Sequence, residues 1–240
     1  MKSMSDNRFL TSSKVTGRAT ERVLSAVRQA IVELELLPGA AIDKAALCER
    51  FGVSKFPVSD ALARLQTEGL VEILPQRGTR VARIRASDLV EAMFIRRPLE
   101  IEMVRTLAPD ASDAWLAELE MNLDYQAVTI ERGDRRAFHR HDLAFHELML
   151  RELAFPRVTA AVDAARNSLE RARRMLSSPR RHADTLREHK AIFAALKQRD
   201  PDAAGQAMNA HLRAVLSELT ALADANPAIF ELNHQTLSAD

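Results

Sequence analysis

The chain has 240 residues, of which 47% are hydrophobic and 5% aromatic, with a net charge of +1 and one cysteine. This length allows one large domain or two smaller ones, and the lone Cys48 excludes an intramolecular disulfide. No apolar run approaches the roughly 18 residues of a membrane span, and the polar N-terminus lacks a signal-peptide core, so we expect a soluble cytoplasmic protein.

The chain begins with a polar segment and a long amphipathic one. Residues 1–19 show no periodicity, and we expect a flexible tail there. From Thr20 to about Leu36 apolar residues recur at helical spacing, which predicts a helix. The sequence LPGA at 37–40 follows, and its Pro and Gly indicate a turn that ends the helix.

Two more helices and a hairpin follow. Asp43 is a typical N-cap and Gly52 a typical C-terminal stop for a short helix between them. A third helix is expected over 55–68, buried on one side. The apolar stretches 70–74 and 79–84, joined by a PQRG turn, predict a two-stranded hairpin.

This order of elements over residues 20–86 is that of a winged helix-turn-helix, with three helices and a β-hairpin wing. Its third helix enters the major groove of DNA and its wing reaches the backbone or minor groove. Residues 1–85 carry 14 Lys and Arg against 9 Asp and Glu, whereas the remainder carries 20 against 24. A basic N-terminal part favours double-stranded DNA as partner. The side chains expected to face DNA are Lys44, Lys55, Phe56, Ser59, Arg64, Arg77, Gly78 and Arg80.

Residues 87–224 are helical in pattern throughout. This pattern breaks at five places: 109–112, 133–134, 155–156, 177–179 and 200–201, where Asp200 is expected to cap a helix that begins at Pro201. We therefore expect an all-α bundle of about six or seven helices, followed by a C-terminal tail at 225–240. The predicted fold class is mainly α, a winged helix-turn-helix followed by a helical bundle.

Four polar residues of this bundle are expected to face its interior. Asp142 and His146 are four residues apart and share a helix face, while His189 and His211 each lie within an apolar stripe of a separate helix. Burying such groups unpaired is unfavourable. A divalent metal ion would explain them, because imidazole and carboxylate suit Zn, Ni, Mn or Fe.

Other residues near these positions leave alternatives open. His139 and His182 could line the pocket or replace a ligand, whereas His141 and His234 are expected at the surface. Glu147 and Glu188, each next to a histidine of the set, are expected to point to other faces, which leaves no obvious general base. The alternatives to a sensing site are a metal-dependent enzyme domain fused to a DNA-binding domain and a DNA-binding protein that ignores small molecules.

Residues 20–85 resemble the DNA-binding domain of the GntR family of bacterial transcription regulators. The matching motifs are LPG, LCERFGVS, PVSDALARL, EGLVE and RGTRV, all in register over one segment. Members of that family commonly have Arg at the positions of Ala45 and Ser59. The operator sequence therefore cannot be transferred from other members.

Residues 88–223 resemble the FCD domain, the helical effector-binding domain of the FadR-type branch of this family. The matching pieces are IRRPLE, DLAFH, EHKAIFAAL and AAGQAMNAHL. The resemblance implies a metal site made of Asp142, His146, His189 and His211. It also matches Arg96 and Glu100 to a motif of the first helix. Two positions depart from the pattern: Pro98 lies inside that helix, and Phe155 replaces a common Asn.

An N₃O ligand set leaves coordination positions open, and a small carboxylate effector can bind there. A guanidinium would hold its other end, with Arg96 the first candidate and Arg173 among those behind it, beside Arg171 and Arg174. We expect a ligand-responsive transcription regulator that binds a palindromic operator as a homodimer, and we expect repression rather than activation.

Overall fold

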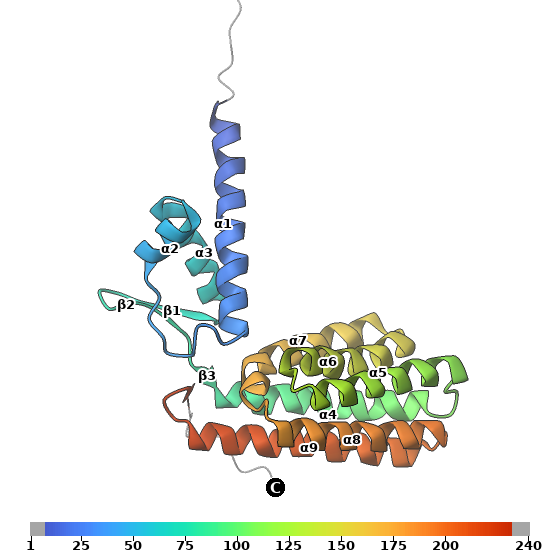
Figure 1. The fold of residues 1–240 in the computed structure, drawn as a ribbon. Coiled ribbons are helices and arrows are strands. Elements are labelled where there is room, and N and C mark those ends of the chain that lie inside the picture. The colour runs from blue at the N-terminus through green and yellow to red at the C-terminus, as the bar shows by residue number, and fades with distance from the viewer. Residues whose placement is uncertain (1–7, 232–240) are drawn as a thin grey trace, which may run out of the picture. The chain divides into compact units, whose positions relative to one another are not determined.

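The computed structural model describes residues 8–231, which form two compact units (Figure 1). Among the described residues, the first unit contains 8–84 together with Ala228–Glu231, and the second contains Arg85–Pro227. The division falls two residues before the expected boundary at 86–87. The predictions for residues 1–7, for 232–240 and for His234 lie outside the described residues.

The first unit has the predicted order of three helices and a hairpin. The elements are α1 (Arg8–Val32), α2 (Lys44–Phe51), α3 (Lys55–Thr67), β1 (Val71–Leu74) and β2 (Gly78–Val81). The two strands are antiparallel, with Val71 opposite Val81. The fold class of a winged helix-turn-helix followed by a helical bundle is confirmed.

Local signals explain where the short helices begin and end. The Asp43 side chain accepts hydrogen bonds from the backbone N–H groups of Ala45 (2.7 Å) and Ala46 (3.2 Å) at the start of α2. Gly52 ends this helix with φ at 62°, a conformation that glycine adopts without steric cost. The core of the unit lies between α1, α3 and the hairpin and is built from Val23, Val27, Ile31, Val58, Leu62, Leu65, Val71 and Val81.

The two ends of this unit differ from the sequence-based expectation. The helix α1 begins at Arg8, inside the segment expected as a tail, and ends at Val32 rather than near Leu36. Part of the expected C-terminal tail is also ordered. There, β4 (Phe230–Glu231) pairs with β3 (Ile84–Arg85), and the Ile84 N–H donates to the Ile229 carbonyl at 3.0 Å.

The second unit is a bundle of six helices within the described residues, in agreement with the predicted six or seven. They are α4 (Ala86–Leu107), α5 (Asp113–Glu131), α6 (Arg135–Leu153), α7 (Pro156–Met175), α8 (Pro179–Lys197) and α9 (Pro201–Ala225). The helix α4 packs against α6, α7 and α9, and α8 packs against α5 and α9 (Figure 1). No helix in the described part of the chain is both long and apolar enough to cross a membrane.

The breaks between these helices fall where the sequence predicts them, and they carry capping residues, of which Asp200 was predicted. Ser112, Asp134, Ser178 and Asp200 each accept a backbone hydrogen bond at the start of a helix. The departure at Pro98 does not end a helix, because α4 continues through it. The bundle thus forms six long helices whose facing sides meet in one interior.

Leu62→Ala tests the core of the first unit. Leu62 is fully buried in α3, so its truncation is expected to lower the free energy of unfolding of that unit by about 2–5 kcal/mol. The control is Leu37→Ala, which removes a 54% exposed side chain and should change it by less than about 0.5 kcal/mol. Urea unfolding followed by circular dichroism measures both, and equal losses would contradict this description of the core.

Candidate metal centre and nucleic-acid interface

Three imidazole rings meet in the interior of the bundle. His146 comes from α6, His189 from α8 and His211 from α9, and all three are buried. Their ring centroids lie 4.8–5.4 Å apart. One nitrogen of each ring lies within 4.8 Å of the corresponding nitrogens of the other two, so the three rings could hold one metal ion.

Each imidazole is held at Nδ1 by a neighbouring side chain. The pairs are His146 with Glu100 Oε2 (2.8 Å), His189 with Gln126 Oε1 (3.0 Å) and His211 with Glu188 Oε2 (2.8 Å). The contact between His146 and Glu100 is short, but it does not meet the geometry of a hydrogen bond. The three Nε2 atoms are buried and have no hydrogen-bond partner among the described residues. Support at one nitrogen with the other left unpaired is the arrangement found in metal-binding histidines.

Asp142 lies at the edge of this group rather than within it. Its Oδ1 atom is 3.7 Å from His189 Nε2 and, within the described chain, accepts no hydrogen bond. Its other carboxylate oxygen, Oδ2, pairs with the Arg173 guanidinium. The structure therefore brings the four predicted ligands into one region, with three nitrogens close together and one carboxylate oxygen beside them.

Burial sets the charge of these groups. It lowers the pKa of His189 and of His211 well below the ordinary value, and neighbouring histidines add to the effect. Burial by itself would raise the pKa of Asp142, but Arg173 and His189 hold it well below its usual range. At neutral pH the site thus presents neutral imidazoles and a carboxylate, the forms that bind a divalent cation.

Guanidinium groups line the same interior. Arg96 is buried and bonds Glu100, with 2.6 Å between Nε and Oε1. Arg166 of α7 is 5% exposed, and its Nη2 donates to the Leu143 carbonyl at 3.3 Å. Within the part of the chain that is described, Arg166 Nε and Arg173 Nη1 have no acceptor. Arg166 was not predicted from the sequence, although it lies seven residues before Arg173 on the same face of α7.

The two alternative histidines bond elsewhere. His139 Nε2 lies 2.6 Å from Glu170 Oε1, and His182 Nε2 lies 2.9 Å from the Ser177 hydroxyl. The His182 ring also stacks on Phe138, with 4.1 Å between centroids. Neither histidine is among the three that converge.

Glu188 lies on another face of α8 than His189, as expected, because adjacent helix positions are about 100° apart. That face leads to α9 and to His211, so the expectation that Glu188 lies away from the four ligands is wrong. Glu147 is exposed, as expected. His141 is half-buried, with its ring stacked on Tyr125 at 5.2 Å.

The third helix of the first unit exposes several residues predicted to bind DNA. Lys55, Phe56 and Ser59 lie on its exposed side, and Phe56 is 67% exposed. The opposite side of α3 buries Pro57, Val58, Ala61, Leu62 and Leu65. Arg77 and Gly78 are exposed at the tip of the wing, where Gly78 has a φ of 91°. Two separate elements therefore present polar and basic groups to solvent.

The basic residues of this surface differ in how far their charge is already paired. Arg64 pairs with Glu21 at 2.6 Å, and Arg80 pairs with Glu72 at 2.6 Å across the hairpin. By contrast, Lys55 makes no ion pair with any described residue, and neither does Arg77 or the partly exposed Lys44. No described carboxylate therefore competes with an anionic partner for these three cations. The exposed positions Ala45 and Ser59 supply no cation.

Comparison with known proteins assigns both units. The sequence profile described as "Bacterial regulatory proteins, gntR family" matches residues 19–81, and that of the FCD domain matches residues 91–214. A protein of Streptomyces ambofaciens described as an HTH-type transcriptional regulator in an unstable DNA locus is 32% identical, over 94% of this chain and 95% of its own. The HTH-type transcriptional repressor RspR of Escherichia coli K12 is 30% identical, over 85% and 90%.

A solved structure supports the fold. The crystal structure of a putative GntR transcriptional regulator from Rhodococcus sp. RHA1 superposes with a TM-score of 0.69, at 24% identity, and the match covers 84% of this chain and 97% of that one. At this level of identity the likeness shows the fold alone.

Glu170→Gln tests the polar cluster beside the histidines. Burial opposes ionisation of Glu170, but its bonds to His139 and Arg174 lower its pKa to about 2. A lowered pKa in the folded state stabilises the protein above pH 4.5, and this contribution is lost as the pH falls through 2. The variant should be about 3 kcal/mol less stable at pH 7, with the difference shrinking below pH 4.5.

Urea unfolding at several pH values measures this difference. The control is Glu147→Gln, an exposed position of α6 that should change the free energy of unfolding by less than about 0.5 kcal/mol. A difference between Glu170→Gln and the wild type that stays constant from pH 7 to pH 2 would refute the assignment.

Proposed function

Because this chain belongs to the GntR family of bacterial regulatory proteins and is a DNA-binding transcription regulator, we propose that its helical unit binds a divalent metal ion and a small carboxylate. Binding there changes the affinity of the first unit for its operator. The protein acts as a repressor, as the name of its relative RspR, a transcriptional repressor, suggests for this chain.

The metal proposal depends on three buried Nε2 atoms that have no partner in the described residues, on rings that each bring one nitrogen within 4.8 Å of the others. A buried acceptor left unpaired costs about 1–3 kcal/mol, so three of them in one place call for a ligand. His146, His189 and His211 would hold the ion, and Asp142 lies near enough to join them after a small shift. Imidazole with carboxylate suits Zn, Ni or Mn. When bound, the ion supplies open coordination positions for an oxygen ligand.

The effector proposal depends on the neighbouring guanidinium groups. Arg166 Nε and Arg173 Nη1 are buried donors that lack an acceptor among the described residues. A carboxylate is the natural partner of such a pair, because each of its oxygens accepts a charge-assisted hydrogen bond. Arg96, by contrast, already bonds Glu100 through two nitrogens. We therefore place the effector at Arg166 and Arg173, with Arg96 as support.

Regulation follows from linkage between the two ligands. An effector that favours the state with low operator affinity must itself bind more weakly when the operator is bound. We propose a homodimer with two winged helices, which requires a palindromic operator.

The enzyme alternative has less support, because each carboxylate near the histidines is already bound to a guanidinium. Glu100 pairs with Arg96, Asp142 with Arg173 and Glu188 with Arg181.

The double substitution His189→Ala with His211→Ala tests the metal centre. The wild type is expected to bind about one Zn²⁺ per chain, and at 100 times the Kd this should add about 2.7 kcal/mol to its stability. The double variant should lose both effects, because two of three nitrogens are gone. Elemental analysis and thermal unfolding with and without Zn²⁺ measure them.

The control for this experiment is His139→Ala. This substitution removes an imidazole that bonds Glu170 and is not one of the three converging histidines. It should bind zinc as the wild type does. Unchanged metal content in the double variant would refute the ligand assignment.

Alanine substitutions of Lys55 and Arg77 test the DNA-binding surface. Each should reduce the slope of log K against log salt concentration by about one, because each cation is exposed and unpaired among the described residues. Arg80→Ala should change the slope less, since Glu72 already pairs with that guanidinium.

Fluorescence anisotropy with labelled operator DNA measures the slopes, and Lys190→Ala, an exposed position of α8, is the control. A slope that does not change would remove that residue from the phosphate contacts.

A further inference from the structure

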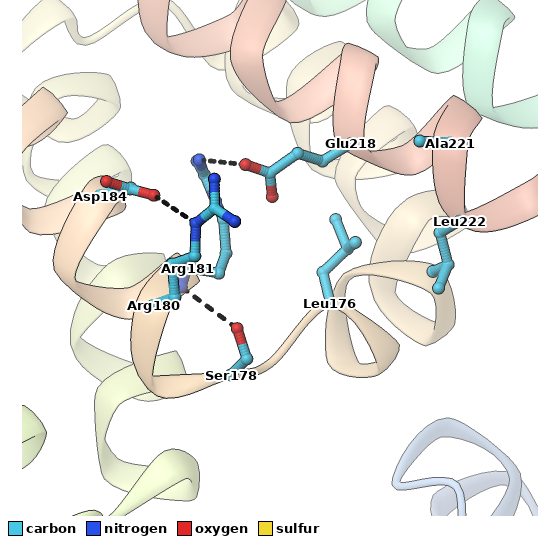
Figure 2. A pocket seen from close by; sticks show the side chains of 8 residues that line it. All are labelled: Leu176, Ser178, Arg180, Arg181, Asp184, Glu218, Ala221 and Leu222. Carbon is cyan, nitrogen blue, oxygen red and sulfur yellow. Dashed lines mark hydrogen bonds and ion pairs between the residues drawn. The ribbon is translucent and has the colours of Figure 1, made fainter.

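A chain of charged side chains runs from the histidine centre to a surface cleft between α8 and α9. The cleft has a volume of about 390 Å³ and is walled by Leu176, Arg181, Glu218 and Leu222 among others (Figure 2). Arg181 extends across it toward Glu218, as Figure 2 shows. The same guanidinium reaches the interior on its other side, so one residue touches both the cleft and the support of the metal centre.

The contacts are specific on both sides of Arg181. Its two terminal nitrogens donate to the two carboxylate oxygens of Glu188, Nη1 to Oε1 at 3.0 Å and Nη2 to Oε2 at 2.8 Å. Nη1 also donates to Glu218 Oε1 at 3.1 Å. The oxygen of Glu188 that accepts from Nη2 is the one that lies 2.8 Å from His211 Nδ1. Arg181, Glu188 and His211 therefore form an uninterrupted series.

This series has a counterpart elsewhere in the bundle. Arg96 bonds both oxygens of Glu100, and Glu100 contacts His146 Nδ1. That first series is closed to solvent, since the Arg96 and Glu100 side chains are 1% and 0% exposed. The second ends at Glu218, which is 39% exposed in the cleft. Of the two histidines of the metal centre that a carboxylate supports, His211 is thus the one whose support reaches the surface.

Bidentate contact with a guanidinium fixes both the position and the plane of a carboxylate. A carboxylate at Nδ1 in turn fixes the tautomer and orientation of an imidazole and raises its basicity as a ligand. Arg181 and Glu188 lie seven residues apart, two turns on the same side of α8, which lets the helix hold this geometry. The guanidinium is nearly buried, so few other conformations are open to it.

We propose that Arg181 is a positioning residue of the metal centre: it holds Glu188, and through Glu188 it sets how strongly His211 binds the ion. The proposal rests on metal binding by this unit, as put forward above. Arg181 itself does not contact the ion. The affinity of the interior site therefore depends on a side chain that forms the wall of a surface cleft.

The test measures the Zn²⁺ affinity of the full chain by competition with a chromogenic chelator. Arg181→Met and Glu188→Gln should each weaken binding by about 10- to 100-fold, the range seen when the outer support of a metal ligand is removed. Arg181→Lys keeps the charge but loses the bidentate contact, and it should fall between wild type and Arg181→Met. Glu218→Gln leaves the contact of Arg181 with Glu188 intact and should change affinity by less than about threefold.

The matched control is Arg180→Met. Arg180 is the neighbouring residue, lines the same cleft and is 94% exposed, with a single long contact of 3.9 Å to Asp184 (Figure 2). Its removal should leave the Zn²⁺ affinity within twofold of wild type. An equal loss in Arg180→Met and Arg181→Met would overturn the proposal, because the effect would then come from the charge of the cleft.

A second readout separates positioning from mere stability. The visible absorption of the Co²⁺ complex reports the ligands around the ion, so Glu188→Gln and Arg181→Lys should shift its bands while the protein remains folded by circular dichroism. These milder variants keep the test decisive if Arg181→Met does not fold. If Glu188→Gln and Arg181→Lys both show wild-type affinity and an unshifted spectrum, the role of Arg181 is overturned, whereas the proposed metal centre is not. A wild type that binds neither ion would overturn the metal centre and the proposal together.

Discussion

The bundle is organised around three buried, neutral imidazoles, and the Nε2 atom of each is unpaired in the described chain. An apolar interior would make the folded state more stable, because each buried unsatisfied polar atom costs free energy of folding. The bundle nevertheless contains these polar atoms, and each of its six helices contributes a residue to the arrangement around them. The contributions are Glu100 from α4, Gln126 from α5, Asp142 and His146 from α6, Arg166 and Arg173 from α7, Glu188 and His189 from α8, and His211 from α9.

Charge balance in this interior explains why so many ionised groups are tolerated. Glu100 is paired with Arg96 and Asp142 with Arg173, so each buried carboxylate has a guanidinium. Arg166 has no carboxylate partner among the described residues, and burial lowers its pKa. The interior therefore holds one positive charge more than its carboxylates balance. That excess, together with the unpaired donors, is the physical basis for an anionic effector beside a cation.

Much of the fold follows from local signals in the sequence. The bounds of α2 match the prediction because Asp43 and Gly52 act within a few residues of themselves, and the breaks of the bundle fall where Ser, Asp, Gly and Pro stand. The start of α1 was missed because residues 8–19 are mostly polar, and periodicity becomes visible only where apolar residues recur. The pairing of Phe230 and Glu231 with β3 was missed because such a short strand is defined by a partner far away in the chain.

The residues of the site also fall into those that local sequence predicts and those that depend on distant contacts. The spacing of Asp142 and His146 and the apolar stripes around His189 and His211 mark groups that face inward, and this can be read from one helix at a time. The sequence of a single helix does not reveal the residues whose roles depend on which neighbouring helix their side chains meet. These are Gln126, Arg166 and Glu188. For Glu188 the prediction from its own helix gave the right face and the wrong conclusion.

X-ray absorption spectroscopy of the zinc-loaded wild type identifies the atoms that bind the ion. We predict three imidazole nitrogens at about 2.0–2.1 Å from the zinc, with oxygen completing the coordination. A bound zinc ion without any imidazole ligand would show that the three histidines do not form the metal site.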